Sequence, residues 1–402
     1  MRGFASRSTV VEAWAWLDSR LAPLGAERVP LRDSAGRVLA EGITSRFNVP
    51  SFARAMMDGF AVRAADTLGA SLYNRLVLRV IGESMPGRGF AGVVGPGQAV
   101  RIMTGAPLPA GADAVLPFEQ TECAAEQLAV QGETTPGKHV GRVGEDVASG
   151  SEVLAAGRAL RPQDVGVLAS IGEADLPVRL RPRVRLLVTG NELLPVGSIP
   201  KPPCIVDSNG PMLEALVRRD GGLPNHPGIV PDHPEAILDK MRADAEVILV
   251  SGGSSVGRED HAPMLLRQYG ELAIHGVAMR PSSPAGMGTL DRRLVFLLPG
   301  NPVSCLAAYD VFAGRAIRKL GGRSADWPYR RVRVPLIRKV VSAIGRLDYQ
   351  RVRLVSGQAE PLAIAGASIL SSTVRADGFM LVPPDSEGFP PGAEVEVYLY
   401  GG

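Results

Sequence analysis

Cysteine is scarce in this chain of 402 residues, with only Cys123, Cys204 and Cys305, far apart in the sequence. No C-x-x-C pair occurs, so neither a structural zinc site nor a disulfide framework is predicted. Such cysteine usage is typical of a reducing compartment, and we expect a cytoplasmic protein. No apolar run approaches the roughly 18 residues of a membrane-spanning helix, and no apolar signal-peptide core is seen near the N-terminus.

Aromatic residues are also few, at 5% of the chain, which argues against base-stacking platforms for nucleic acid. The net charge of +3 gives no electrostatic case for nucleic acid or a membrane as partner. The five histidines show no H-x-x-x-H or related spacing, so a histidine-based zinc site is not predicted. Neither a G-x-S-x-G elbow nor a Walker-type phosphate loop occurs, which removes two common enzyme signatures.

Glycine and proline, by contrast, are plentiful, with 47 and 33 residues. They favour many turns and β-rich modules over a helical bundle. Apolar content of 45% and charged content of 21% are typical of a soluble globular protein. A chain of 402 residues exceeds one ordinary core, so we expect two to four domains.

Three segments with different predicted secondary structure follow one another along the chain. From about 30 to 180, short β-like runs alternate with Gly and Pro clusters, as in small β modules. From about 182 to 322, strands alternate with helices, which predicts a parallel sheet with crossover helices. The final 75 or so residues return to β character and form a separate module. Helices are predicted over 8–24, 162–171, 211–219 and 234–241.

Three glycine-bearing loops are the strongest functional signal. They are TGNEL (189–193), SGGSSVGRED (251–260) and PGNPVSC (299–305), and each directly follows a short run rich in Val and Leu. Such a run followed by a Gly loop describes the strand-to-helix turn of an α/β sheet, where ligands bind at the carboxyl ends of the strands. The loops therefore predict a shared edge for an anionic ligand, with a phosphate and a divalent metal.

The second loop carries the largest number of candidate ligand contacts. Its glycines let the backbone approach a ligand closely, and its serines add hydroxyls; the residues concerned are Ser251, Gly252, Gly253, Ser254 and Ser255. Asp260, at the end of the loop, could hold Mg²⁺ or orient water. The alternative is a plain strand-to-helix turn with Asp260 as the helix cap.

The other two loops also have two interpretations each. Glu192, directly beyond a buried strand, is a candidate metal ligand or general base, or it only opens the next turn. Asn301 before Pro302 presents a helix N-terminus that favours an anion, or is a helix cap and nothing more. Asp232 and Glu235 have capping-box spacing, so the residues alone favour Asp232 as a helix cap, with a site residue as the alternative.

Turn signals dominate the N-terminal half. Asp58–Gly59 is a turn dipeptide, and Thr104–Gly105 follows a predicted strand. Glu145 and Asp146 fall in a predicted exposed loop. Nothing intrinsic to these residues makes them catalytic.

Eight motifs, taken in order, resemble the MoeA family of molybdopterin molybdenumtransferases, which is similar to the E domain of gephyrin. They are MMDGFAVR, RIMTGAPLPAGADAV, GEDV, TGNEL, VDSNGPML, SGGSSVGREDH, LLPGNPVSC and GRLDYQRV. The resemblance runs from about residue 10 to the C-terminus, and eight motifs in one order leave little room for chance.

The resemblance implies a mixed α/β, multi-domain protomer and an elongated homodimer. The implied parts are a discontinuous linker and dimerisation domain (1–48 and 145–180), a β-rich inserted domain (49–144), a molybdopterin-binding α/β domain with a mainly parallel sheet (181–325) and a C-terminal β-barrel-like domain (326–402). The implied activity takes adenylylated molybdopterin and molybdate, uses Mg²⁺ or Zn²⁺, inserts molybdenum into the dithiolene and releases AMP. Its cleft is expected at the dimer interface.

The resemblance also assigns roles to residues. Catalytic roles fall on Asp58, Thr104, Asp146, Glu192, Asp232 and Asp260, of which Glu192, Asp232 and Asp260 are implied metal ligands. Substrate contacts are implied for the serines and glycines of 251–255, for Arg280, Ser283 and Asn301, and for Ser371 or Ser372. Asp232 thereby changes from an expected cap to an expected site residue.

One segment departs from the family. Where the family typically reads K-P-G-K-P, this chain has Arg280-Pro281-Ser282-Ser283-Pro284. Arg280 keeps a positive charge that can grip molybdate or phosphate bidentately, whereas Ser283 replaces the second cation by a hydroxyl. One such anion contact contributes about 1.5–3 kcal/mol. Three alternatives are therefore open. The site binds its anion more weakly, or Arg258 or Arg292 replaces the lost cation, or the site binds a different ligand.

Two other functions stay open. A non-catalytic molybdopterin-binding or scaffold homologue would explain the missing second lysine, although carboxylates at five matching positions argue against it. A hydrolase of another nucleotide pyrophosphate would use the same metal and glycine loops, and it would release AMP from ordinary dinucleotides without molybdate.

Overall fold

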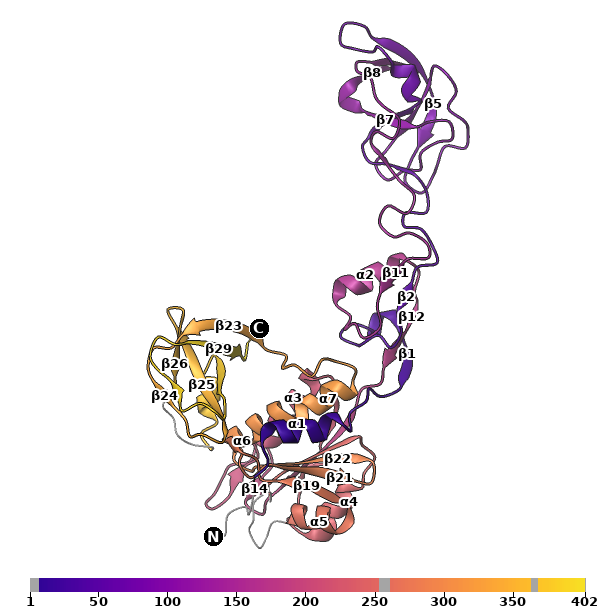
Figure 1. The fold of residues 1–402 in the computed structure, drawn as a ribbon. Coiled ribbons are helices and arrows are strands. Elements are labelled where there is room, and N and C mark those ends of the chain that lie inside the picture. The colour runs from indigo at the N-terminus through magenta and orange to yellow at the C-terminus, as the bar shows by residue number, and fades with distance from the viewer. Residues whose placement is uncertain (1–6, 253–260, 363–367, 402) are drawn as a thin grey trace. The chain divides into compact units, whose positions relative to one another are not determined.

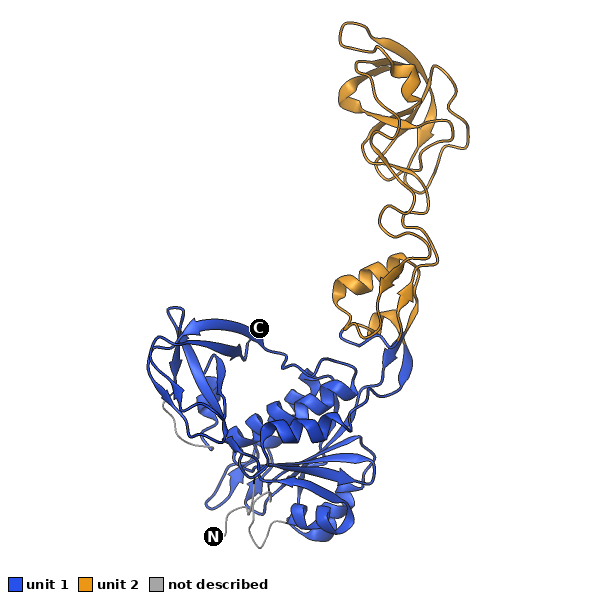
Figure 2. Cartoon of the chain, viewed as in Figure 1, with its two compact units in different colours: residues 1–28, 36–40, 177–402 blue, residues 29–35, 41–176 orange. Residues whose placement is uncertain are grey.

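The structure is a computed structural model that describes residues 7–252, 261–362 and 368–401. It contains two compact units, coloured blue and orange in Figure 2. The first comprises residues 1–28, 36–40 and 177–402, and the second comprises 29–35 and 41–176. Strands β1 (Ala26–Pro30) and β12 (Asp175–Arg179) each contain a point where the chain passes from one unit to the other. Within the described ranges, none of the helices has the length and apolarity to cross a membrane.

A seven-stranded sheet forms the centre of the first unit. Its strands, in spatial order, are β16 (Leu223–Asn225), β13 (Arg183–Thr189), β18 (Val247–Ser251), β22 (Arg293–Leu298), β21 (Gly286–Leu290) and β19 (Glu271–His275), with β17 (Ile229–Val230) also paired to β13. Strands β16, β17, β18 and β22 are parallel to β13, whereas β21 and β19 are antiparallel to their neighbours. The mainly parallel sheet expected for this segment is confirmed.

Helices cover both faces of this sheet (Figure 1). On one face lie α1 (Val10–Asp18), α3 (Asn209–Arg219), α6 (Pro302–Ala308), the π-helical turn η4 (Tyr309–Ala313) and α7 (Gly314–Leu320); on the other lie α4 (Pro234–Met241) and α5 (His261–Tyr269). Alternate residues of each central strand enter the two cores: Leu249 belongs to one and Ile248 to the other. Because both faces are buried, the strands are continuous apolar runs.

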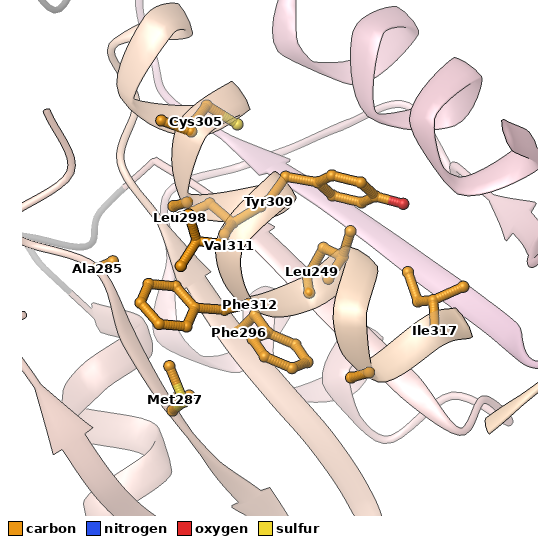
Figure 3. Packing of buried hydrophobic residues seen from close by; sticks show 14 of the residues in the cluster. Leu249, Ala285, Met287, Phe296, Leu298, Cys305, Tyr309, Val311, Phe312 and Ile317 are labelled. Atoms are coloured by element: carbon orange, nitrogen blue, oxygen red, sulfur yellow. The ribbon is translucent and has the colours of Figure 1, made fainter. Parts of the chain in front are cut away.

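Figure 3 shows the first of these cores, where Leu249 and Phe296 of the sheet lie beside Tyr309 and Phe312 of the π-helical turn. All four side chains are almost completely buried. This packing fixes the helices that follow β22 against the sheet, and with them the loop that leads from β22 into α6.

The helix ends follow local chemistry. Helix α1 begins with a capping box in which the Thr9 hydroxyl accepts from Glu12 N at 3.1 Å and the Glu12 carboxylate accepts from Thr9 N at 2.7 Å. It ends at Asp18, earlier than the predicted range of 8–24, since Pro23 lacks an N–H and blocks the preceding turn. Helix α3 begins at Asn209, so Pro211 lies within the first turn, where its missing N–H has no intrahelical partner to lose.

The C-terminal module is a second sheet within the first unit. Its strands, in order, are β20 (Met279–Arg280), β25 (Leu347–Val355), β27 (Gly378–Val382), β29 (Glu394–Leu399) and β23 (Arg330–Pro335), with β26 (Gln358–Pro361) on β25, a separate pair of β24 (Val340–Val341) and β28 (Gly388–Phe389), and helix α8 (Ser371–Val374). Strand β20 comes from the α/β module, and Arg280 is in register with Asp348. One strand therefore joins the two modules.

Aromatic residues, scarce in the chain, gather at this junction. Around Phe379 pack Trp327, Tyr329, Tyr349, Tyr398 and Tyr400. The hydroxyls of Tyr329 and Tyr349 donate to the buried Asp310 carboxylate of η4 at 3.0 and 3.3 Å. Burial raises the pKa of Asp310, and Arg219, 3.0 Å away, opposes that rise. Hydrogen bonds thus join the C-terminal module to the π-helical turn of the α/β module.

The second unit is rich in β structure, as expected. Its main sheet runs β7 (Ala114–Pro117), β4 (Gly59–Val62), β6 (Gln98–Ile102), β5 (Leu76–Ser84), β9 (Gln127–Val130) and β8 (Thr121–Ala124). The smaller elements are β2 (Ile43–Thr44) paired with β11 (Glu152–Leu154), β3 (Arg54–Ala55) paired with β10 (Val140–Gly141), helix α2 (Pro162–Ser170) and the 3-10 turns η1 (Leu31–Asp33), η2 (Ala64–Thr67) and η3 (Phe118–Gln120). The finer division into four domains stays a prediction.

Candidate functional site

Three predicted loops meet at the carboxyl-terminal edge of the parallel strands. The last residues of β13, β18 and β22 are neighbours, because Val188 is in register with Ser251 and Ser251 with Leu298. Strand β17 ends at the same edge, where Val230 is in register with Thr189. Glu192, Asp232, Gly252 and Asn301 follow these four strands within a few residues. The topology therefore brings the loops to one edge, as their sequences indicated.

Two glycines at this edge have backbones that a side chain would disturb. Gly252 has φ +100°, and a Cβ there would lie 2.3 Å from the carbonyl oxygen of Thr189. Gly190 has φ +155°, and a Cβ there would lie 2.7 Å from a Glu192 carboxylate oxygen. Both positions require glycine, which leaves the backbone of β18 close to that of β13 and lets the Glu192 carboxylate fold over its own loop.

Asn209, the first residue of α3, ties the loops together. Its side-chain amide donates to Ser251 Oγ at 2.9 Å and to the carbonyl oxygen of Gly300 at 2.8 Å. Its Oδ1 is buried and has no hydrogen-bond partner among the described residues. The capping role at this helix belongs to Asp207, whose carboxylate accepts from Gly210 N at 3.0 Å. No role in joining the loops had been predicted for Asn209 from the sequence.

Asp232 lies one residue before the N-cap of α4. That N-cap is His233, with φ −135°, and the His233 side chain makes no capping bond. The expected capping box placed Asp232 at the N-cap itself, one residue earlier than the N-cap in the structure. The half-buried carboxyl of Asp232 is at the strand edge with Glu192.

Two of the three expected metal ligands, Glu192 and Asp232, lie within the described residues. Glu192 and Asp232 supply two carboxylates at the edge, and oxygen ligands of this kind suit Mg²⁺. No three His, Cys, Asp or Glu side chains in the described ranges are grouped closely enough to hold a metal ion. Asp260, the third expected ligand, lies outside the described residues, as do Gly253, Ser254 and Ser255.

Cys305, on α6 behind the edge, is buried, and its Sγ lies 3.8 Å from Ser251 Oγ. Burial raises the pKa of the Cys305 thiol to about 12. Since the thiolate is the reactive form, Cys305 fills space and is not a nucleophile.

Beside this edge lies a basic cavity of about 1080 Å³ between the α/β module and the C-terminal module. Its walls come from 278–284, from 299–304 and from the C-terminal module. Six basic side chains of the described residues line it, namely Arg7, Arg280, Arg338, Lys339, Arg346 and Arg351, and no Asp or Glu of those ranges does. Asn301 lines the same cavity, and it makes no side-chain capping bond to α6.

Arg280 is held against the cavity wall by a buried carboxylate. Its guanidinium lies 2.7 Å from Asp348, which also accepts from Ser342 Oγ at 2.8 Å and from Arg346 Nε at 3.0 Å. Asp348 is fully buried, whereas 47% of the Arg280 side chain is exposed. Arg280 therefore has a fixed anchor and an accessible face for an anion.

The hydroxyl of Ser283 lies in the same wall. Ser283 Oγ is buried and has no hydrogen-bond partner among the described residues. Arg292 cannot replace the missing lysine, because it lies in the turn between β21 and β22, at the opposite edge of the sheet. Arg258 lies outside the described residues. The extra cations come instead from the C-terminal module, and no role had been assigned to them from the sequence.

Of the two C-terminal serine candidates, Ser372 is the one beside the cavity cations. Its buried Oγ accepts a hydrogen bond from Arg351 and donates to the carbonyl oxygen of Ile369 at 2.5 Å. Ser371 is exposed. One step along a short helix turns a side chain by about 100°, so the two neighbouring serines face different surroundings, and the choice between them stays a prediction.

Asp58 and Thr104, 46 residues apart, are bonded to each other in the second unit. Asp58 Oδ1 accepts from the backbone N and the hydroxyl of Thr104, both at 2.7 Å. These bonds lower the pKa of Asp58, which is exposed and stays ionised near neutral pH. Asp146 is exposed in the loop between β10 and β11. The resemblance had grouped these residues as functional, whereas their local sequence indicated only turns.

Gly59 is the first residue of β4 rather than part of a hairpin turn. A Cβ at Gly59 would lie 1.8 Å from the carbonyl oxygen of Leu116 on β7. The turn predicted at Asp58–Gly59 is thus displaced: the chain bends over 56–58, between β3 and β4, and Gly59 already belongs to the strand, where glycine allows the close strand approach.

A mainly parallel sheet with helices on both faces and glycine loops at one strand edge defines the class of α/β proteins that bind ligands at their strand ends. Comparison with known proteins narrows this class. The family described as "MoeA N-terminal region (domain I and II)" matches residues 8–172, "Probable molybdopterin binding domain" matches 185–319 and "MoeA C-terminal region (domain IV)" matches 333–400.

Relatives match over nearly the whole chain. A Mycobacterium tuberculosis protein named molybdopterin molybdenumtransferase 2 is 35% identical over 386 residues, covering 92% of this chain and 94% of its own. A Staphylococcus aureus protein named molybdopterin molybdenumtransferase is 30% identical, with 97% and 95% covered. The crystal structure of a molybdopterin biosynthesis MoeA protein from Pyrococcus horikoshii matches with a TM-score of 0.84 and 33% identity, covering 98% of this chain and all of that one. The chain belongs to the MoeA family.

Proposed function

We propose that this protein is a molybdopterin molybdenumtransferase of molybdenum cofactor biosynthesis. It inserts molybdenum from molybdate into adenylylated molybdopterin and releases AMP. The observation that carries the proposal is the basic cavity beside the strand edge, because the reaction needs an oxyanion and a phosphorylated pterin next to each other. The names of relatives that are 30–35% identical over nearly the whole chain support the same activity.

The cavity takes the molybdate. Arg280 offers its accessible face, Ser283 offers a hydroxyl without another partner among the described residues, and Arg351 enters from β25 with Ser372 behind it. A guanidinium and hydroxyls suit a tetrahedral oxyanion, since each donates a hydrogen bond to an oxygen. The second cation that the K-P-G-K-P pattern would place at 283 is supplied here by the C-terminal module.

The strand edge takes the phosphates of adenylylated molybdopterin. Gly252 brings bare backbone within reach, Ser251 supplies a hydroxyl and Asn301 lies between the edge and the cavity. Gly253, Ser254 and Ser255 belong to the same proposed contact. Asn209 holds the two loops together, which keeps these contacts in one place before the substrate binds.

Glu192 and Asp232, with Asp260, are the proposed ligands of Mg²⁺ or Zn²⁺. A divalent ion there would polarise a phosphoryl oxygen of the pyrophosphate. Glu192 and Asp232 follow the neighbouring strands β13 and β17 within a few residues, which supports placing both carboxylates near the expected phosphates.

A second copy of the chain completes the site in this proposal. Asp58, Thr104 and Asp146 would come from the partner of a homodimer. Large apolar side chains are exposed just before Asp58, at Phe47 (58%), Phe52 (44%), Met56 (56%) and Met57 (39%). Several exposed apolar side chains within one short segment favour contact with another protein surface. The three free cysteines agree with the reducing cytoplasm, where we place the protein.

The deciding experiment measures AMP release from adenylylated molybdopterin and Mg²⁺, with and without molybdate. We expect release that depends on molybdate and falls in a folded Glu192→Ala variant. Tight binding without release would identify a non-catalytic molybdopterin-binding homologue. Release from ordinary dinucleotides without molybdate would identify a pyrophosphate hydrolase. A wild-type rate in folded Glu192→Ala would remove Glu192 from the site.

Mixing two inactive variants tests the shared site. If each site takes Glu192 from one chain and Asp58 from the other, a mixture of Glu192→Ala and Asp58→Asn chains recovers about a quarter of the wild-type rate, since half of the dimers are mixed and each has one intact site. No recovery after verified subunit exchange would contradict the proposed dimer site.

A further inference from the structure

The cavity loop 280–284 contains a backbone outlier at Ser282. Its φ is +90°, in the left-handed region that favours glycine. A residue with a Cβ is strained there, and such strain persists only where the surroundings hold the residue in place. Contacts around Ser282 must therefore keep its backbone in this conformation.

The side chain of Ser282 is the tether. It is 2% exposed, and its hydroxyl donates to the carbonyl oxygen of Ser304 on α6 at 2.6 Å. The Ser282 carbonyl oxygen accepts from Ala285 N at 2.9 Å, which closes the loop locally. Ser304 also lines the cavity. Ser282 therefore bonds the loop on one wall to the helix on the adjoining wall.

The neighbours of Ser282 are the anion contacts of the loop. Two residues earlier, Arg280 is fixed to Asp348, and one residue later Ser283 turns its hydroxyl into the buried wall of the cavity. The carbonyl oxygen of Ser283 accepts from Val277 N at 2.9 Å. Because Ser282 lies between these two anchored residues, its φ sets the direction in which the Ser283 hydroxyl points relative to the Arg280 guanidinium.

We propose that Ser282 is a positioning residue of the oxyanion cavity, whose strained backbone and buried hydroxyl hold Arg280 and Ser283 in the orientation that an oxyanion needs. The proposal rests on the proposed function, which makes this cavity the molybdate site. A loop fixed before binding loses less freedom when the anion arrives, which raises affinity without adding a contact. Ser282 itself need not touch the anion.

If Ser282 positions the anion contacts, a variant can lose molybdate affinity without losing folding stability. In Ser282→Gly the strain is relieved while the tether is lost, so the melting temperature stays close to that of the wild type but the loop is free to move. In Ser282→Ala the strain remains and the tether is lost, so stability and binding both fall. A purely structural role predicts instead that molybdate affinity follows stability in both variants.

The test is isothermal titration of the full-length protein with sodium molybdate, together with thermal unfolding. We expect both Ser282 variants to bind molybdate about fivefold or more weakly, the size of one lost ordered hydrogen bond. The matched control is Ser356→Gly, which replaces another serine with positive φ (+48°) in the turn between β25 and β26, away from the cavity lining. It should bind like the wild type.

Each other outcome has a defined meaning. Wild-type affinity in Ser282→Gly would overturn the positioning role and leave the proposed function intact. Equal weakening in Ser356→Gly would also overturn it, since the effect would not be specific to the cavity loop. A wild-type protein that binds no molybdate would overturn the assignment of the cavity, and this inference with it.

Discussion

Replacing Arg280 by Gln removes one of the six basic side chains of the cavity and tests whether its accessible face binds the oxyanion. A hydrogen bond to a charged group contributes about 1.5–3 kcal/mol, which corresponds to a rise of about 10- to 150-fold in the Kd for molybdate. Arg280 is 47% exposed, so solvent screening places the expected effect toward the lower end of this range.

The same change has a separate effect on folding. Asp348 is fully buried and loses one of its cationic partners, but it keeps Ser342 and Arg346. Breaking a fully buried ion pair costs about 3–5 kcal/mol, whereas an exposed pair contributes about 0–1 kcal/mol. With one partner buried and the other half exposed, we expect about 1–2 kcal/mol. The melting temperature should then fall by about 2–8 °C.

Titration with molybdate and thermal unfolding measure the two effects independently. Arg292→Gln is the matched control, because it removes the same charge from the opposite edge of the sheet and should change neither quantity appreciably. The reasoning is refuted if Arg280→Gln binds molybdate as tightly as the wild type, or if Arg292→Gln weakens binding equally, which would indicate a general charge effect. A loss of stability with unchanged affinity would make Arg280 a structural partner of Asp348 only.

Three further predictions concern other parts of the molecule. Ser283→Lys should tighten molybdate binding about tenfold or more, because it adds a charged donor to the cavity wall; an unchanged titration would show that the C-terminal cations already suffice. Thr104→Val should lower molybdate-dependent AMP release about tenfold or more, since Asp58 loses a hydroxyl donor at 2.7 Å; a wild-type rate would remove the pair from the site. Two arginines lower the pKa of Asp164, so its stabilising effect is present above its unfolded pKa of about 3.9 and is lost as pH falls through the folded value. Urea unfolding of Asp164→Asn should therefore lose less stability below about pH 4 than the wild type, and parallel pH profiles would contradict this.

The strand edge could be predicted from sequence because its signals are local. An apolar run followed at once by a Gly loop specifies a buried strand and its exit, and parallel strands place such exits together. The positive φ of Gly252 and its approach to Thr189 give that loop a geometric reason for glycine. The central sheet and its helices were predictable for the same reason.

The basic cavity could not be predicted from sequence because its contacts are non-local. Arg338, Lys339, Arg346 and Arg351 reach 278–284 only because β20 joins the C-terminal sheet, with Arg280 in register with Asp348. A strand of only two residues, such as β20, is too short to produce a periodic pattern in the sequence, so its pairing with another module cannot be predicted. The bond between Asp58 and Thr104 is hidden in the same way, by 46 residues of intervening chain.

The distribution of tryptophan has a spectroscopic consequence. All three tryptophans, at 14, 16 and 327, lie in the first unit, and the second unit has none. The Trp327 indole donates to the carbonyl oxygen of Asp310 at 2.8 Å and packs on Phe379 and Tyr398, at the junction of the two modules. Intrinsic tryptophan fluorescence will therefore report on the first unit, including that junction, and not on the second unit, whose unfolding needs circular dichroism or an introduced tryptophan. Fluorescence and circular dichroism together can show whether the two units unfold in one transition or in two.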